Sequence, residues 1–241
     1  MSSFTYLVTG ASRSLGLGYS RALLASSPAV KVVAAARNPS KAAGLQALEK
    51  EFKGRVYLLK LDVADAEAAK AAAQELEKSG FLASGGLDAL INNAGVAESP
   101  SKPSELPKDE VLYHFETNLF GVMNVTSAFL PLLKKGKGKQ VFGVSSVCGS
   151  LGGSFSENSL ATAYCISKAA LNMYLKKLAS ELDGDGFTVV SFHPGYVKTD
   201  MNKGQGELTT EEAVDLAVKN VFLRKNKTGE FRSYDGSEMP W

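Results

Sequence analysis

Tyr164 and Lys168 are the pair in this sequence best suited to move a proton. Residues four positions apart on a helix lie on the same face. A free phenol has a pKa of about 10, and an ammonium about 4 Å away contributes on the order of 4 kcal/mol at an effective dielectric near 20, which would lower that pKa by several units. The phenol could then exchange a proton with a substrate oxygen. Alternatively, both residues belong only to the stripe of an amphipathic helix, so the rest of the chain must decide.

A turn rich in small residues follows the first predicted strand. Residues 4–9 are apolar and β-branched, and a helical pattern resumes over residues 15–24. Small residues between a strand and a helix let backbone amides and the helix N-terminus approach a pyrophosphate. We therefore predict that this turn binds the phosphates of a dinucleotide, through Gly10, Ser12, Arg13, Ser14, Leu15 and Gly16.

The second predicted strand, residues 30–36, ends in Arg37 and Asn38. An acidic residue at this point would bind the ribose 2′-hydroxyl of NAD, whereas an arginine suits the 2′-phosphate of NADP. We predict NADP(H) as the cofactor, with Arg37 and Arg13 forming a cationic clamp on the phosphate. The alternative is that the two arginines are solvated surface side chains.

Seven apolar segments alternate with six helical patterns, which is typical of a parallel sheet with helices on both faces. We predict an α/β fold, a Rossmann-type doubly wound parallel sheet of about seven strands. We expect one domain over residues 1–241, because no internal repeat or second-domain boundary is visible. The remaining strands are expected at residues 56–61, 87–91, 140–144, 188–192 and 230–234, and helices at 64–78, 108–134 and 209–224, with the tyrosine helix ending before Gly184.

Composition excludes several classes of function. The formal charge is +2, from 27 basic and 25 acidic residues, and no basic run stands out, so a nucleic acid partner is not expected. No apolar stretch approaches the ~20 residues that span a bilayer, and the first residues do not resemble a signal peptide. We expect a cytoplasmic protein without a membrane partner. Cys148 and Cys165 lack metal-ligand spacing and are too few for a disulfide framework, so we expect reduced thiols and no metal site.

The chain carries a series of short motifs in a fixed order: Thr9-Gly10 to Gly16, Asp62-Val63, Asn92-Asn-Ala-Gly95, Asn118, Ser146, Tyr164-x-x-x-Lys168 and Pro194-Gly195-x-Val197-x-Thr199. Together, and in this order, these motifs resemble the short-chain dehydrogenase/reductases in their single-domain branch, over essentially the full length. The C-terminal Asp235-Gly-x-x-x-Pro-Trp241, with Arg37, is similar to the carbonyl-reductase branch that contains sniffer-type, C-factor-like and fungal norsolorinic-acid ketoreductase-like proteins.

The resemblance implies a catalytic role for four residues. Tyr164 would donate or accept the proton, and Lys168 would lower its pKa and hold the nicotinamide ribose. Ser146 would hydrogen-bond the substrate oxygen, with Ser145 as the second choice. Asn118 would support a proton-relay water; as an asparagine inside a helix it is either solvated or buried for a purpose, and the sequence leaves both options open.

The resemblance also implies further contacts with the cofactor. Asp62 and Val63 would contact the adenine, and the strand end after residue 91 would contact the adenosine side. The loop after residue 193 would meet the carboxamide end. The residues assigned in these last two segments are Asn92, Ala94, Gly95, Pro194, Gly195, Val197 and Thr199.

Two features depart from the family pattern. Ser14 stands where the family has its middle glycine, which places a β-carbon and a hydroxyl close to the phosphates. The 18 positions from Ser146 to Tyr164 exceed the usual gap, so extra residues around Ser150 to Leu160 would lie beside the site. The candidate substrate-lining residues are Cys148, Leu151, Phe155, Tyr196 and Met201.

These observations favour an NADPH-dependent reduction of a ketone or aldehyde, a small-molecule carbonyl substrate, with Tyr164 as the proton donor. The alternatives are a non-catalytic protein that senses NADP(H), and an NADP-dependent alcohol dehydrogenase with net oxidation. His114 and His193 are interpreted as structural, because an acid-base set is complete without them. Family habit suggests a homodimer or homotetramer.

Overall fold

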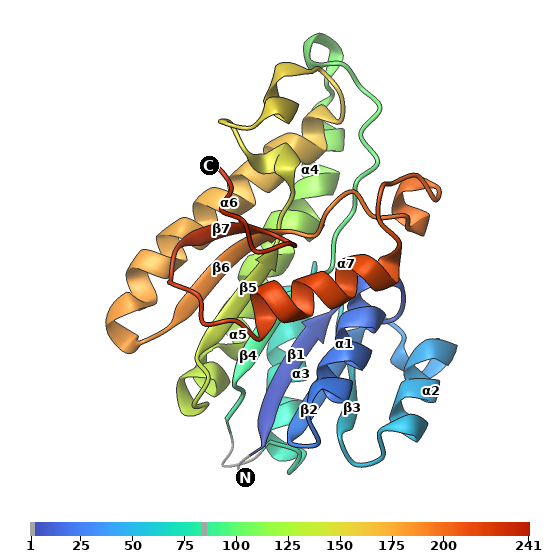
Figure 1. Ribbon diagram of the computed structural model, residues 1–241, viewed down its shortest axis with the longest axis vertical. Helices are drawn as coiled ribbons and strands as arrows, with labels where there is room; N and C mark the ends of the chain where they lie inside the picture. Colours follow the sequence, from blue (N-terminus) through green and yellow to red (C-terminus); the bar gives the residue numbers. More distant parts are fainter. Residues whose placement is uncertain (1–2, 83–85) are drawn as a thin grey trace. The chain divides into compact units, whose positions relative to one another are not determined.

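The chain forms one seven-stranded sheet in a computed structural model that describes residues 3–82 and 86–241 (Figure 1). The strand order is β3-β2-β1-β4-β5-β6-β7, and it reverses between β1 and β4, as in doubly wound sheets. Strands pair in parallel where β1 meets β2 and β4, where β2 meets β3, and where β6 meets β7. The predicted α/β class is confirmed. The strands are β1 Phe4–Thr9, β2 Val30–Ala36, β3 Val56–Lys60, β4 Ala89–Asn92, β5 Gln140–Val144, β6 Thr188–His193 and β7 Glu230–Ser233.

The described residues form two compact units. The first comprises Met1–Ala94 and Met123–Phe142, and the second comprises Gly95–Val122 and Gly143–Trp241. The principal helices are α1 Ser14–Ser26, α2 Ala43–Glu51, α3 Ala66–Lys78, α4 Lys108–Phe115, α5 Gly121–Lys135, α6 Thr162–Leu182 and α7 Thr210–Ala217.

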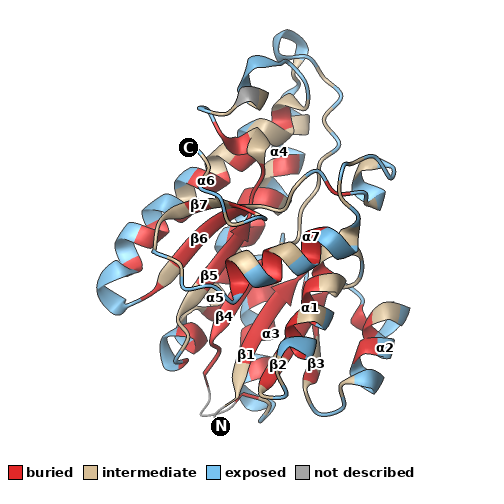
Figure 2. Ribbon diagram, viewed as in Figure 1, coloured by how far each residue is buried: buried red, intermediate tan, exposed pale blue. Residues whose placement is uncertain are grey.

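The core of the first unit is built on β1 and β2. Figure 2 shows both strands buried along nearly their whole length, and Leu7, Val8, Val32 and Val33 are fully buried. Continuous apolar runs of this kind are typical of parallel strands covered on both faces. Tyr19 of α1 is also fully buried, so α1 covers part of this core.

In the second unit, α6 packs on the sheet through leucines at helical spacing. Leu171, Leu175, Leu178 and Leu182 are buried, as residues that recur on one helix face should be. Gly143 of β5 makes room for this helix, because a β-carbon there would lie 2.2 Å from Leu175 Cδ1.

The structure corrects the uninterrupted helix predicted for residues 108–134. A π-helical turn, η4 (Glu116–Phe120), separates α4 from α5. The helix predicted for residues 209–224 is also interrupted, because α7 is followed by the π-helical turn η9 (Val218–Phe222). A π turn inserts a residue and rotates the next helical turn about the axis, whereas helical periodicity over these segments gives no sign of the insertion.

No helix within the described ranges combines the length and apolar character needed to cross a bilayer.

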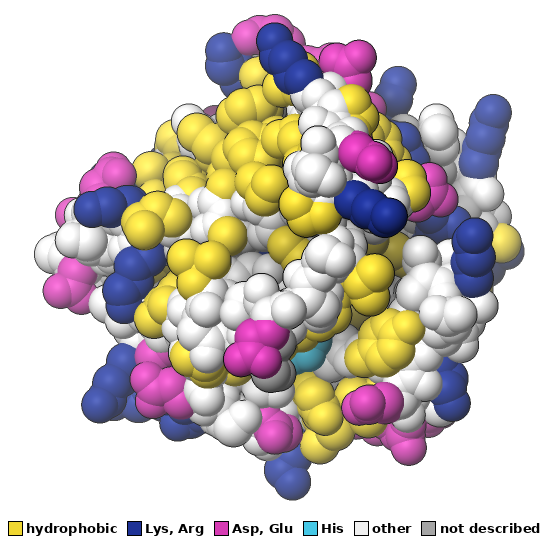
Figure 3. Space-filling view, turned by 90° about the horizontal axis from the view of Figure 1, so that it is seen from above, with side chains coloured by type: hydrophobic (Ala, Val, Ile, Leu, Met, Phe, Trp, Pro, Cys, Tyr) yellow, Lys and Arg dark blue, Asp and Glu magenta, His cyan; other side chains and the backbone are white. Residues whose placement is uncertain are grey.

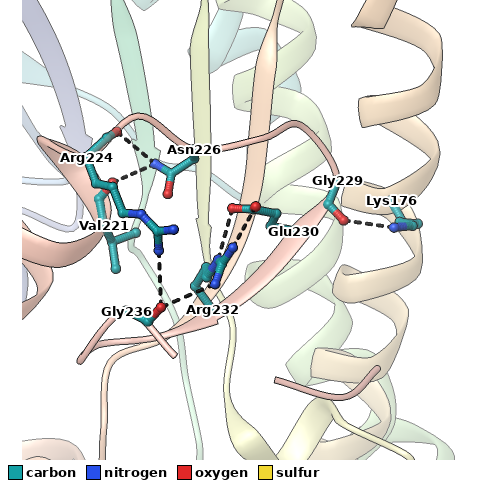
Figure 4. Close-up of polar contacts among 8 residues, drawn as sticks. All are labelled: Lys176, Val221, Arg224, Asn226, Gly229, Glu230, Arg232 and Gly236. Carbon is teal, nitrogen blue, oxygen red and sulfur yellow. Dashed lines mark hydrogen bonds and ion pairs between the residues drawn. The ribbon is translucent and has the colours of Figure 1, made fainter. Parts of the chain in front are cut away.

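An ion pair within β7 holds the last strand of the sheet (Figure 4). Arg232 donates through Nε and Nη2 to the Glu230 carboxylate, at 2.9 and 2.6 Å. The two side chains are only 11% and 10% exposed. Arg224, which precedes β7, and Arg232 both donate to the carbonyl of Gly236. These bonds tie the residues after β7 to the segment before this strand.

Replacing Glu230 by Gln leaves Arg232 buried without its partner, and we expect the free energy of unfolding to fall by about 3 kcal/mol at neutral pH. The hydrogen bonds from Arg232 lower the pKa of Glu230. The pair therefore contributes fully above the unfolded-state value of about 4.3, and this contribution is lost as the pH falls through the lower folded-state value. Urea unfolding of wild type and Glu230→Gln across this pH range measures the difference.

The control is Glu67→Gln, which removes one partner of the exposed pair between Lys70 and Glu67. It should change stability little, because exposed ion pairs contribute little. Equal effects of the two substitutions, or a difference that grows as the pH falls, would contradict this account of β7.

Candidate functional site

Tyr164 and Lys168 both lie near the start of α6, in the second unit. Lys168 Nζ lies 5.7 Å from the centroid of the Tyr164 ring, and the side chain of Ser146 is close enough to the phenol to act on its pKa. The edge of the His114 ring lies against Tyr164, with centroids 6.3 Å apart. The structure thus brings together three of the four residues predicted to be catalytic.

Lys168 is buried, with 5% of its surface exposed, and its ammonium donates to the carbonyl of Val144 at 2.8 Å. Burial lowers the pKa of Lys168 to about 8, so the side chain is mainly cationic at neutral pH. The bond to Val144 uses one of the three N–H donors of an ammonium. Two donors therefore remain for a ligand.

The pKa of Tyr164 differs in direction from the sequence expectation. Burial raises it above the ordinary value, and Cys148 acts in the same direction, whereas the side chain of Ser146 opposes the increase. Burial has this effect because a medium of low dielectric penalises the charged phenolate. The phenol therefore holds its proton in the structure.

Asn118 lies in the π-helical turn and is fully buried. Its amide donates to the carbonyl of Val96 at 2.9 Å and to Ser167 Oγ at 3.0 Å, and its oxygen accepts from the Val96 N–H at 2.9 Å. The side chain thus joins the segment after β4 to α6 beside Lys168. Of the two options that the sequence left open for Asn118, the buried one is observed.

The two serines after β5 have different partners. Ser145 donates to Asn172 Oδ1 at 2.6 Å, whereas Ser146 accepts from the Cys148 N–H at 3.2 Å and acts on the pKa of Tyr164. Ser146 begins the short 3-10 helix η5 (Val147–Gly149). The geometry therefore supports Ser146 rather than Ser145 as the partner of the phenol.

Helix η5 packs closely on α6. A β-carbon at Gly149 would lie 2.7 Å from the backbone carbonyl carbon and oxygen of Lys168. Asn172 donates to the Gly149 carbonyl at 3.0 Å. This packing fixes the distance between the residues after Ser146 and the helix that carries Tyr164.

The end of the chain holds the segment that follows η5. Ser150 Oγ donates to the Pro240 carbonyl at 2.7 Å, and the Gly152 N–H donates to the Trp241 oxygen at 2.9 Å. The Trp241 ring packs on Phe231, with centroids 5.3 Å apart. From the sequence these C-terminal residues are recognisable only as a family feature. Their contacts with Ser150 and Gly152 were not predicted, because no local pattern indicates them.

In the first unit, the glycine turn is held by the residues after β4. Asn93 Nδ2 donates to the Thr9 carbonyl at 2.8 Å, and Thr9 Oγ1 accepts from the Asn93 and Ala94 amides. A β-carbon at Gly16 would lie 2.4 Å from the Gly10 carbonyl oxygen. Asn93 belongs to the predicted motif at residues 92–95 but is not among the residues assigned to the cofactor, and the structure gives it this role in holding the turn.

Ser14 has a φ of 46°, in the left-handed region that favours glycine. This conformation gives a physical reason for the glycine that the family pattern has at this position. The other members of the turn, Ser12 and Leu15, are half-buried, while Arg13 is exposed.

The remaining candidate cofactor residues of the first unit occupy two kinds of position. Arg37, Asn38 and Asp62 are exposed, and Val63 is half-buried. Asn92, in contrast, is buried and donates to Thr126 Oγ1 at 3.1 Å. Its side chain therefore supports the fold at the end of β4.

The loop after β6 is tied to itself by side-chain contacts. Gly195 has a φ of 92°, Val197 is buried, and the Val197 carbonyl accepts from Asn202 at 2.7 Å. The Thr199 N–H donates to Asn202 Oδ1 at 3.0 Å. Pro194 and Gly195 are half-buried, as is Gly95 after β4.

The five candidate substrate-lining residues differ in exposure. Leu151 is 80% exposed, and Tyr196 and Met201 are each 49% exposed. Phe155 and Cys148 are half-buried.

Burial lowers the pKa of His193 to about 4 and leaves it neutral at physiological pH, consistent with the structural role expected for it.

Comparison with known proteins gives consistent matches. The family model described as short chain dehydrogenase matches residues 5–209. An uncharacterized oxidoreductase of Schizosaccharomyces pombe is 36% identical, over 98% of this chain and 97% of that protein. The NADPH-bound carbonyl reductase from chicken fatty liver is 31% identical with a TM-score of 0.88, and the carbonyl reductase Sniffer of D. melanogaster is 30% identical with a TM-score of 0.89; each alignment covers 100% of both chains.

Replacing Gly149 by Ala should force η5 away from α6, because the new methyl group meets backbone atoms of Lys168. We expect a loss of about 1–3 kcal/mol in the free energy of unfolding, as is typical of overpacking. Urea unfolding measures it. Gly184→Ala is the matched control, because a β-carbon there meets nothing within 4 Å. If both variants are as stable as wild type, the close packing described here is wrong.

Proposed function

Because the chain belongs to the short-chain dehydrogenase family, and is thus an oxidoreductase, we propose that it reduces a ketone or aldehyde with NADPH. The observation that carries this proposal is the cluster of Ser146, Tyr164 and Lys168 in the second unit, in which the Lys168 ammonium lies 5.7 Å from the phenol ring and Ser146 acts on the pKa of the phenol. This cluster holds a neutral phenol, a hydroxyl and a buried cation close together, which is what protonation of a carbonyl oxygen requires.

The cofactor is NADP(H), as in the chicken carbonyl reductase, which is NADPH-bound. The turn in the first unit suits a pyrophosphate, since Gly10 and Gly16 leave no room for β-carbons against Asn93 and the Gly10 carbonyl, which keeps the turn tight at the N-terminus of α1. Arg37, exposed directly after β2, is suited to the 2′-phosphate. When bound, the cofactor supplies the hydride for the carbonyl carbon.

Tyr164 supplies the proton. Its raised pKa keeps the hydroxyl protonated before the reaction, so the phenol can donate a hydrogen bond, and then the proton, to the substrate oxygen. Ser146 donates a second hydrogen bond to the same oxygen and polarises the carbonyl. The phenolate that remains is stabilised by the positive charge of Lys168 and by the hydroxyl of Ser146. Both groups favour the charged form of the phenol.

Lys168 also binds the nicotinamide ribose through the two N–H donors that the Val144 carbonyl leaves available. Asn118 acts as a positioning residue, because its contacts with Val96 and Ser167 join the segment after β4 to α6. Holding a proton-relay water would be a second role of Asn118, besides these contacts.

The substrate class follows from exposed apolar residues of the second unit. Leu151 and Leu160, on either side of the segment that lengthens the gap between Ser146 and Tyr164, are 80% and 69% exposed. Figure 3 shows apolar side chains gathered on part of the face seen from above. Such a surface favours bulky apolar carbonyl compounds, such as quinones and aromatic ketones.

Replacing Tyr164 by Phe should lower kcat by about a hundred- to ten-thousandfold, the contribution of a positioned general acid. The affinity for NADPH should change little, because the ring remains. NADPH oxidation with a panel of dicarbonyls, quinones and aromatic ketones measures the effect, and Tyr57→Phe, at a half-buried tyrosine that donates to Glu75, is the matched control.

Equal turnover by wild type and Tyr164→Phe would remove the tyrosine from the chemistry. If wild type instead binds NADPH and turns over no carbonyl or alcohol, the chain is a cofactor-sensing protein and the reductase proposal fails.

Replacing Arg37 by Ala should weaken NADPH binding by about 10- to 100-fold, the loss expected for a charge-assisted hydrogen bond to phosphate. NADH binding should be unaffected, since that cofactor lacks the 2′-phosphate. Fluorescence titration with both cofactors measures the ratio. Arg21→Ala, at the exposed pair with Glu51, is the control. An equal loss for NADH and NADPH would show that Arg37 does not read the phosphate.

A further inference from the structure

The two cysteines of the chain lie beside the proton-transfer cluster. Cys148 is in η5, two residues after Ser146, and Cys165 is on α6, directly after Tyr164. Both thiols are free and half-buried. Neither has a part in the reduction proposed above, so their proximity calls for another explanation.

The packing of η5 on α6 brings the two thiols together. Cys165, Lys168 and Asn172 recur at helical spacing on α6 and so share a face. Gly149, next to Cys148, contacts two of them, since it approaches the backbone of Lys168 and accepts a hydrogen bond from Asn172. Cys148 therefore lies beside the start of this helix, where its thiol and that of Cys165 alter each other's pKa. The Cys165 thiol itself donates to the Leu160 carbonyl at 3.7 Å.

The thiols are not equivalent. The pKa of Cys148 is lowered, first by the neighbouring Cys165 thiol and also by Ser146 and the Lys168 cation. The pKa of Cys165 is raised by the neighbouring Cys148 sulfur and by burial. A thiolate at Cys148 with a protonated neighbour is the arrangement of an attacking and a resolving cysteine.

We propose that Cys148 and Cys165 form a reversible thiol-modification site, at which a hydroperoxide joins the two sulfurs in a disulfide. The Cys148 thiolate attacks one peroxide oxygen, so that an S–O bond forms, the O–O bond breaks and hydroxide leaves as water after taking a proton. The Cys165 sulfur then attacks the Cys148 sulfur, giving its proton to the departing hydroxide. The S–S bond replaces the S–O bond, a second water is released, and the two sulfurs have given two electrons to the peroxide.

The disulfide would tie η5 to the helix that carries Tyr164. Ser146 precedes Cys148 by two residues and Tyr164 precedes Cys165 directly, so the serine and the phenol would shift relative to each other. Displacements of about 1 Å in an active site can cost a hundredfold in rate. This consequence rests on the proposed reductase function, whereas formation of the disulfide does not.

The test uses the intact protein with hydrogen peroxide as the oxidant. No lysine or arginine lies between Lys139 and Lys168, so trypsin releases both cysteines in one peptide, residues 140–168. After peroxide treatment we expect this peptide to take no maleimide label, and its halves to remain linked after cleavage at Glu157. Dithiothreitol should restore both labels and, with them, the carbonyl reductase activity that peroxide lowers by about 10- to 100-fold.

Cys165→Ser is the control for activity. It should keep its basal turnover, and peroxide should not give the linked peptide. In Cys148→Ser, Cys165 should remain open to the label after peroxide. The proposal is overturned if the wild-type peptide keeps both labels after oxidation, or if Cys148 alone is converted to sulfinic acid while Cys165 stays labelled. Because peptide mapping needs no turnover, an inactive protein that still forms the disulfide would refute only the reductase function.

Discussion

The candidate site depends on one buried contact, the hydrogen bond from the Lys168 ammonium to the Val144 carbonyl at 2.8 Å. A buried ammonium is costly without a partner, so this bond fixes the start of α6 against the end of β5. Tyr164 lies four residues before the lysine, and Ser146 lies two residues after the carbonyl. A single contact therefore sets the relation between phenol, serine and cation.

The residues around this contact leave little freedom for α6. Gly149 admits no β-carbon against Lys168, and Asn118 bonds Ser167 on the neighbouring position of the helix. Ala161, which precedes the helix, adopts a φ of 52°, a conformation that non-glycine residues rarely adopt. Strained or buried polar positions of this kind are typical of sites whose geometry serves a reaction.

Much of the fold could be predicted from the sequence, because buried parallel strands read as continuous apolar runs and β2 is such a run. The pair of Tyr164 and Lys168 could be predicted because both residues lie on one helix. The π-helical turn at Asn118 could not, since an inserted residue leaves helical propensity unchanged. Nor could the raised pKa of Tyr164, because desolvation depends on the tertiary packing around a side chain and not on its neighbours in sequence.

The most direct test of the account is a crystal structure of the protein with NADP⁺ bound. The account predicts that Lys168 keeps its bond to the Val144 carbonyl while its remaining donors bind the nicotinamide ribose, and that the Tyr164 hydroxyl lies beside the nicotinamide ring. A nicotinamide ring remote from Tyr164, or a Lys168 side chain without contact to the cofactor, would contradict it.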